Sequence, residues 1–145
     1  MSTVALFTWM ATVLVGLILL AIWLIEYDRD FQSVAATRLP VPVISAHALL
    51  GIGGLLGWGI YTVADIDTLA LASVADLGVV AVLGLIMAAR WLQVYRIYAS
   101  PSASRAILIA VPPERHFPRP VIVIHGLLAA TTVVLVVLTV FFTGS

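Results

Sequence analysis

Four long stretches of the chain carry almost no charge, and this feature limits the folds open to the sequence. The stretches are 5–25, 39–64, 69–89 and 120–145, and Asp76 is the only Asp, Glu, Lys or Arg within them. Each stretch exceeds the about 20 apolar residues that a helix needs to cross a bilayer. The strands of a membrane β-barrel would alternate apolar and polar residues, and these stretches do not alternate. The sequence therefore predicts an all-α membrane protein with four transmembrane helices.

The composition agrees with this fold class and excludes several functions. Charged residues make up 10% of the chain, whereas a soluble domain carries about 25%. The absence of cysteine excludes disulfides, iron–sulfur clusters and zinc sites built on thiolates. No nucleotide-binding loop, zinc-protease motif or nucleophile motif is present, so a stand-alone enzyme is not the expected class. We expect one transmembrane domain, 1–145, in a lipid bilayer, without nucleic-acid binding.

The basic residues predict the orientation of this domain. All seven are arginines, a usage typical of a GC-rich genome, and they lie in or beside the segments 26–39 and 96–119. The turn near 65–67 and both termini carry none. Because basic residues concentrate in cytoplasmic loops, we expect the loops 26–39 and 96–119 to be cytoplasmic and both termini to lie outside. The expected location is a bacterial cytoplasmic membrane.

Two phrases of the sequence occur twice. Residues 40–50 read PVPVISAHALL and residues 118–128 read PRPVIVIHGLL, with seven of eleven positions identical. Residues 16–27 (GLILLAIWLIEY) and 84–95 (GLIMAARWLQVY) match at seven of twelve positions. The phrases at 16–27 and 84–95 lie at the ends of the first and third apolar stretches, and those at 40–50 and 118–128 lie at the starts of the second and fourth. The pattern predicts an up-down-up-down bundle built from two tandem two-helix repeats, 5–64 and 69–143.

The first phrase aligns His47 with His125. Repeats with an even number of spans share one orientation, so an axis along the membrane normal would relate them. The second and fourth helices would then be diagonal partners, with both histidines at equal depth. Neighbouring helices pack about 8–10 Å apart, which makes the diagonal roughly 12–14 Å. That distance is too long for direct contact between the imidazoles, and it suits two imidazoles with a metal between them.

The metal centre that this pattern favours is a haem b with two axial histidines. Small residues one and two turns beyond His47 would leave room for a flat macrocycle, and arginines at the same membrane side would pair with its propionates. The candidate site consists of two ligands, three arginines and two glycines: His47, His125, Arg38, Arg119, Arg90, Gly51 and Gly54. In helix number and histidine placement the chain resembles the small four-helix b-type cytochromes. The resemblance implies electron transfer with a quinone or a partner subunit.

Two other functions stay open at this point. The chain could be an accessory subunit of a larger membrane complex, such as a respiratory one, with histidines that form interhelical hydrogen bonds. The glycine-rich segment 51–59 would then be a helix-packing surface, with Gly53 and Gly57 at GxxxG spacing. The chain could instead be a small transporter or proton-path protein that uses the two histidines as titrating groups. Four helices bury little interior, so we expect association with itself or with other membrane subunits.

Overall fold

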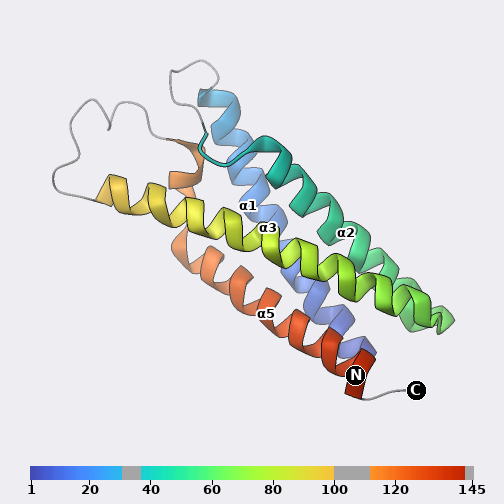
Figure 1. The fold of residues 1–145 in the computed structure, drawn as a ribbon. Coiled ribbons are helices and arrows are strands. Elements are labelled where there is room, and N and C mark those ends of the chain that lie inside the picture. The colour runs from blue at the N-terminus through green and yellow to red at the C-terminus, as the bar shows by residue number, and fades with distance from the viewer. Residues whose placement is uncertain (31–36, 100–111, 143–145) are drawn as a thin grey trace.

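A computed structural model of the protein describes residues 1–30, 37–99 and 112–142. Four long helices and one short 3-10 helix follow each other in the described chain (Figure 1): α1 (Ser2–Asp30), α2 (Val41–Ala64), α3 (Asp67–Ala99), η1 (Pro113–His116) and α5 (Arg119–Phe142). Each of the four long helices is long and apolar enough to cross a membrane. The predicted all-α four-helix membrane bundle is therefore confirmed.

Proline and a left-handed residue set the ends of α2. Pro40 is the N-cap residue, and a second proline, Pro42, lies in the first turn. Proline suits this place because the first turn of a helix does not use its amide donors. At the other end Asp65 adopts φ 54°, and its N–H donates to Tyr61 O at 2.9 Å. This hydrogen bond closes the last turn of α2, and α3 begins two residues later.

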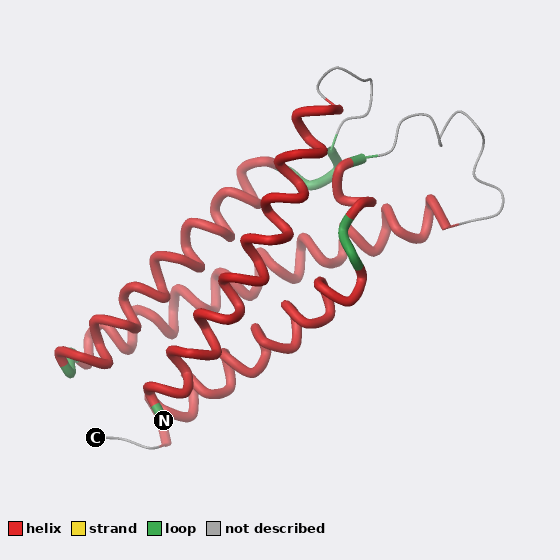
Figure 2. The backbone as a smooth tube through the Cα atoms, turned by 180° about the vertical axis from the view of Figure 1, so that it is seen from behind, coloured by secondary structure: helices red, strands yellow, loops and turns green. Residues whose placement is uncertain are grey.

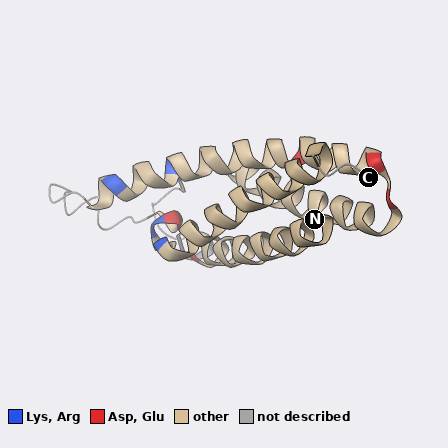
Figure 3. Ribbon diagram, turned by 90° about the horizontal axis from the view of Figure 1, so that it is seen from below, with Lys and Arg blue, Asp and Glu red and all other residues tan. Residues whose placement is uncertain are grey.

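The helix α3 is longer than its apolar stretch. The uncharged residues end at Ala89, but the helix continues to Ala99 and has 33 residues. At 1.5 Å per residue it measures about 50 Å, against about 30 Å for the hydrocarbon core of a bilayer. Its last turns carry Arg90 and Arg96 beyond the apolar zone. Figure 3 shows the arginines gathered at this end of the bundle, which we call the loop end, and acidic residues near the opposite, terminal end.

The four helices pair across the predicted repeats. The helix α2 packs most closely on α3, and α1 packs most closely on α5, so the bundle consists of an α2–α3 layer and an α1–α5 layer. The seams between the layers, α1 with α2 and α3 with α5, are looser. Consequently α2 and α5 are diagonal partners, and they run in the same direction (Figure 1). The helices converge at the terminal end and splay apart at the loop end (Figures 1 and 2).

Two apolar clusters hold the layers together. The cluster near the terminal end contains Ala5, Trp9, Trp58, Ala70, Leu77 and Val136, and the cluster near the loop end contains Trp23, Leu39 and Ile44. The indole of Trp9 also donates a hydrogen bond to Gly51 O at 3.1 Å. Along α2, His47 lies between Ile44 of one cluster and Trp58 of the other. The histidine therefore sits in the part of the bundle that neither cluster fills.

At the loop end, the buried side chain of Glu114 connects η1 to the start of α2. Glu114 of η1 is fully buried, and its Oε1 accepts a hydrogen bond from the backbone N–H of Arg38 at 2.7 Å. Its Oε2 accepts one from the Thr37 hydroxyl at 3.0 Å, and the indole of Trp23 donates to the same hydroxyl oxygen at 3.3 Å. This network ties η1 to the start of α2 and to α1. Residues 31–36 and 100–111 of the two loops lie outside the described residues.

Candidate histidine site

The structure brings His47 and His125 together. Their ring centroids lie 6.2 Å apart, and the ring planes cross at 70°. One ring comes from α2 and the other from α5, so the pair bridges the two layers across the bundle axis. No hydrogen bond joins the two rings among the interactions of the described residues. The imidazoles face each other, as the repeated phrase predicts, without bonding to each other.

A backbone carbonyl of the neighbouring helix orients each imidazole. His47 Nδ1 donates to Val80 O of α3 at 3.0 Å, and His125 Nδ1 donates to Thr12 O of α1 at 3.0 Å. Because a carbonyl only accepts hydrogen bonds, Nδ1 carries the hydrogen, and in the neutral ring Nε2 keeps a free lone pair. Histidines that ligate metals are commonly held in this way through their second nitrogen. Nε2 is therefore the nitrogen of each ring that could bind a metal.

Two glycines let the helices approach these rings. A Cβ atom at Gly84 would lie 3.1 Å from His47 Cε1, and one at Gly16 would lie 2.9 Å from His125 Cε1. Each glycine follows by one turn the residue whose carbonyl accepts the hydrogen bond. Gly16 aligns with Gly84 at the start of the second repeated phrase, but the phrase alone assigns neither glycine a role. Their shared position in the repeat was the signal that could have identified them.

The glycines proposed from sequence lie elsewhere in the packing. A Cβ atom at Gly51 would lie 3.9 Å from Val80 Cγ1. One at Gly54 would overlap the Asp76 carboxylate and come within 2.7 Å of the Trp9 indole. Both glycines therefore bring α2 close to α3, which is the helix-packing role that the sequence also allowed. They do not open space directly beside the imidazoles.

Asp76 is the one acidic side chain inside a predicted span. It lies nine residues after Asp67, the first residue of α3, which corresponds to about 13–14 Å along the helix. Its Oδ2 atom is buried and has no hydrogen-bond partner among the described residues. The carboxyl packs on Gly54 instead. It belongs to the same face of α3 as Val80, one turn away, and no described hydrogen bond joins it to His47 or His125.

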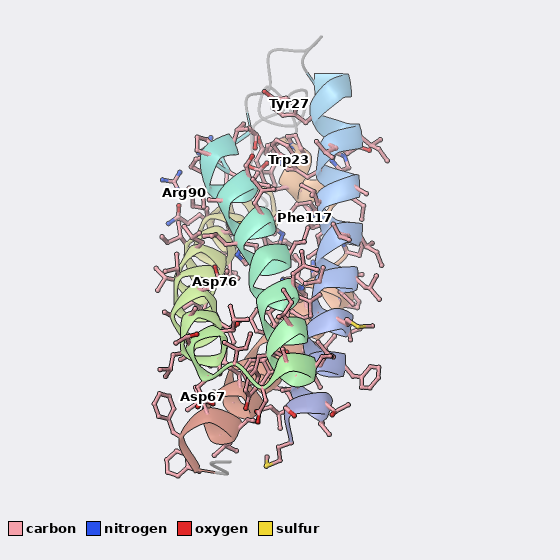
Figure 4. The ribbon with its side chains drawn as sticks, turned by 90° about the vertical axis from the view of Figure 1, so that its right-hand side faces the viewer. Trp23, Tyr27, Asp67, Asp76, Arg90 and Phe117 are labelled. Atoms are coloured by element: carbon pink, nitrogen blue, oxygen red, sulfur yellow. The ribbon has the colours of Figure 1, made fainter. Side chains whose placement is uncertain are left out.

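The three candidate arginines lie at the loop end. Arg90 Nη1 donates to Arg38 O at 3.2 Å, and both side chains are exposed. Figure 4 shows Arg90 on the side of the bundle that faces away from α1. Arg119 lies over the ring of Tyr95, 4.1 Å from its centroid, at a distance typical of a cation–π contact. Within the described contacts none of these guanidinium groups touches His47 or His125.

The available donor set suits a metal that needs only two protein ligands. Within the described residues no group of three or more His, Cys, Asp or Glu side chains could hold a metal ion. A structural zinc ion takes four protein ligands, whereas a haem iron takes four nitrogens from its macrocycle and two axial ligands from the protein. Two metal–nitrogen bonds of about 2.0–2.1 Å and two ring radii of about 1.1 Å add to about 6.3 Å between centroids. The observed 6.2 Å agrees with that value.

An apolar groove lies in the seam beside His47. Its volume is about 420 Å³, and it is lined by Leu20, Trp23, Leu24, Tyr27, Val41, Ile44, Ser45, Ala48 and Leu49 of α1 and α2. Trp23 and Tyr27 stack within it, with centroids 4.6 Å apart. The groove extends from the level of the histidines toward the loop end. Its apolar lining suits the edge of a flat hydrophobic cofactor.

Comparison of the chain with protein-family models, curated proteins and solved structures finds no significant match. The geometry of the histidine pair and the chemistry of its surroundings are therefore the basis for a functional proposal.

Proposed function

We propose that this protein is a membrane electron-transfer protein or subunit of the b-type cytochrome class, with one haem b between His47 and His125. The observation that carries this proposal is the spacing of the two imidazoles, whose centroids are 6.2 Å apart. Both rings are oriented through Nδ1 by a carbonyl of their own layer.

In this proposal the protein supplies ligands, orientation and a dry environment. Bound haem supplies reversible one-electron chemistry, with a potential that depends on the axial ligands, their hydrogen bonds and the burial of the iron. The carbonyls of Val80 and Thr12 hold each ring in place through its Nδ1. Gly16 and Gly84 leave room for the rings between the helices. The electron partner would be a quinone or another membrane subunit that contacts the bundle from the lipid side.

We propose further that the loop end faces the cytoplasm and that both termini lie outside. The arginine distribution supports this orientation, because all described arginine side chains lie at the loop end (Figure 3) and basic residues are retained on the cytoplasmic side. The haem would then lie nearer the cytoplasmic surface, since His47 and His125 each follow a helix-starting proline by seven residues, about 10 Å.

One observation favours the alternative of an accessory subunit. Both histidines form the interhelical hydrogen bonds that a purely structural role requires. Such bonds stabilise a membrane bundle by about 0.6–2 kcal/mol each. The two functions differ in whether Nε2 binds a metal, and a spectrum distinguishes them directly.

The test is the absorbance of the full chain, purified in mild detergent from haem-replete cells. A bis-histidine b-type cytochrome gives a Soret band and sharp α and β bands in the reduced-minus-oxidised spectrum. Extraction of the cofactor as its pyridine complex should give one haem b per chain. A colourless protein that is folded and helical by circular dichroism would reject the cytochrome and support the accessory subunit.

A further inference from the structure

A polar pocket opens at the loop end on the α2–α3 layer. Its volume is about 430 Å³, and it is lined by Thr37, Arg38, Pro40, Arg90 and Gln93. The hydrogen bond from Arg90 Nη1 to Arg38 O, at 3.2 Å, holds one guanidinium beside the start of α2. A guanidinium has five N–H donors, so most of those on Arg90 remain available. Two arginines and Gln93 therefore line the pocket, while the Thr37 hydroxyl is already bonded to Glu114 and Trp23.

Among the described residues, no acidic side chain neutralises the charges in this pocket. No ion pair of Arg38 or Arg90 with an acidic side chain occurs among the described residues. The acidic group nearest in the hydrogen-bond network is Glu114, which is fully buried and bonds the backbone N–H of Arg38 rather than its guanidinium. Two exposed guanidinium groups that share a pocket attract an anion, and phosphate oxygens match their fork of donors.

The position of the pocket relative to the apolar surface points to a lipid as the source of the phosphate. Arg90 directly follows the apolar stretch that ends at Ala89, so it marks the boundary where hydrocarbon gives way to head groups. Ile86, Val82 and Val79 precede it by 4, 8 and 11 residues and share its helix face. Their side chains are 41%, 57% and 52% exposed. An exposed apolar stripe therefore runs along α3 to the pocket. An acyl chain of a lipid bound in the pocket could lie along this stripe.

We propose that this pocket binds the phosphate of one anionic phospholipid, with its acyl chains along the α3 stripe. A zwitterionic lipid carries a cationic group that two arginines would repel, which favours an anionic head group. Basic pockets on membrane proteins recognise such head groups on the cytoplasmic side, where anionic lipids contribute most. The site is separate from the histidine pair, because Arg90 faces away from α1 (Figure 4) and its described hydrogen bond goes to Arg38 O.

The repeat provides an internal comparison within the same chain. By the offsets of the repeated phrases, Arg90 and Gln93 correspond to Ile22 and Ile25. The equivalent place on the other layer therefore lacks the cationic side chain that α3 supplies. One phospholipid per chain is expected to bind tightly, not two.

The experiment is native mass spectrometry of the full chain in detergent with added phosphatidylglycerol, phosphatidylcholine or inorganic phosphate. The wild-type chain should retain one phosphatidylglycerol at collision energies that remove phosphatidylcholine. The double variant R38Q/R90Q should bind it about 25- to 100-fold more weakly, from about five- to tenfold per arginine. The R38K/R90K variant should recover part of the affinity because it keeps the charges. Arg96→Gln removes an exposed arginine of the same helix outside the pocket and should change nothing.

Each of the following results would overturn this proposal. Equal retention of the two lipids, or unchanged retention in R38Q/R90Q, would show that the pocket does not select an anionic head group. Competition by millimolar inorganic phosphate at an affinity equal to that of the lipid would assign the pocket to a free anion. Loss of haem in R38Q/R90Q with unchanged lipid binding would show that the two arginines pair with the haem propionates and not with a lipid phosphate. Circular dichroism of each variant verifies that it is folded, and the lysine variant provides a second, milder change of the same side chains.

Discussion

The imidazole of His125 lies directly against Gly16, where a Cβ atom would come within 2.9 Å of its Cε1. The same ring donates from Nδ1 to Thr12 O, one turn earlier on α1. The glycine and the carbonyl together define a seat for the ring on the helix surface. Gly84 and Val80 form the equivalent seat for His47 on α3. The histidine pair is thus held by backbone atoms of α1 and α3 and needs no side chain from either helix.

Alanine at Gly16 should displace the His125 ring. The added carbon needs space that the imidazole occupies, and overpacking of this kind costs about 1–3 kcal/mol. Gly84→Ala should have a smaller effect, because its Cβ would lie 3.1 Å from the His47 ring and a shift of a few tenths of an ångström suffices. Thermal unfolding in detergent, followed by circular dichroism, measures both changes. Gly78→Ala is the matched control, since no atom lies within 4 Å of its added carbon. Equal melting temperatures for Gly16→Ala and Gly78→Ala would contradict this seat.

Adjacent glycines of α2 should respond in opposite ways to the same substitution. Gly54→Ala forces a Cβ onto the Trp9 indole and the Asp76 carboxyl, so we expect a loss of about 1–3 kcal/mol of stability. Gly53→Ala meets no atom within 4 Å and should be neutral or slightly stabilising. The fraction of helical, monodisperse protein after graded heating distinguishes them. If Gly53→Ala were the more harmful change, α2 would pack with the opposite face toward α3.

The Glu114 side chain should contribute more to the free energy of unfolding than an exposed charged side chain does. Glu114→Gln replaces one accepting oxygen by an NH₂ group, which cannot accept from the Arg38 N–H or the Thr37 hydroxyl. Leaving one buried donor without a partner costs about 1–3 kcal/mol. Thr37→Val removes the same contact from the other side. In a double-mutant cycle the two changes should therefore be less than additive, because the second removes a bond that is already lost. Full additivity would mean that the two groups do not interact.

The proposed topology can be tested by single cysteines, since the chain has none of its own. A cysteine at Ser102 should react with a membrane-impermeant maleimide only after the cytoplasmic side is exposed. A cysteine at Ser145 should react in intact cells. Both positions lie outside the described residues, so the expectation rests on the arginine distribution alone. The reverse labelling pattern would place the loop end outside.

Hydropathy predicted the four helices, because it is a property of short stretches of sequence. The internal repeat predicted that His47 and His125 face each other, because one axis relates equivalent residues of the two repeats. The seats of the rings were not predicted. They depend on α2 packing on α3 and α5 on α1, and no local pattern specifies which helices become neighbours. Nor does hydropathy predict the extension of α3 from Arg90 to Ala99, because helix formation continues after apolar residues end.

Glu114 and Arg90 show the same limit at the loop end. The sequence places a glutamate between prolines and arginines, where an exposed charge is the ordinary expectation. Its burial follows from the backbone donor of Arg38, a partner 76 residues away. Arg90 lies near the end of an apolar stretch, and only the rotation of α3 within the bundle determines that it faces outward (Figure 4).

We propose that one haem iron lies between His47 and His125. Titration of haem into the purified chain is the direct test. Glutamine at either position keeps an amide donor for the carbonyl of Val80 or Thr12 but removes the imidazole ligand. The wild-type chain and His116→Gln should develop the Soret band of low-spin, bis-histidine haem and saturate at one haem per chain. His47→Gln and His125→Gln should each stay folded and fail to form that band. A low-spin spectrum that persists in either glutamine variant, or that never forms in the wild-type chain, would contradict the account.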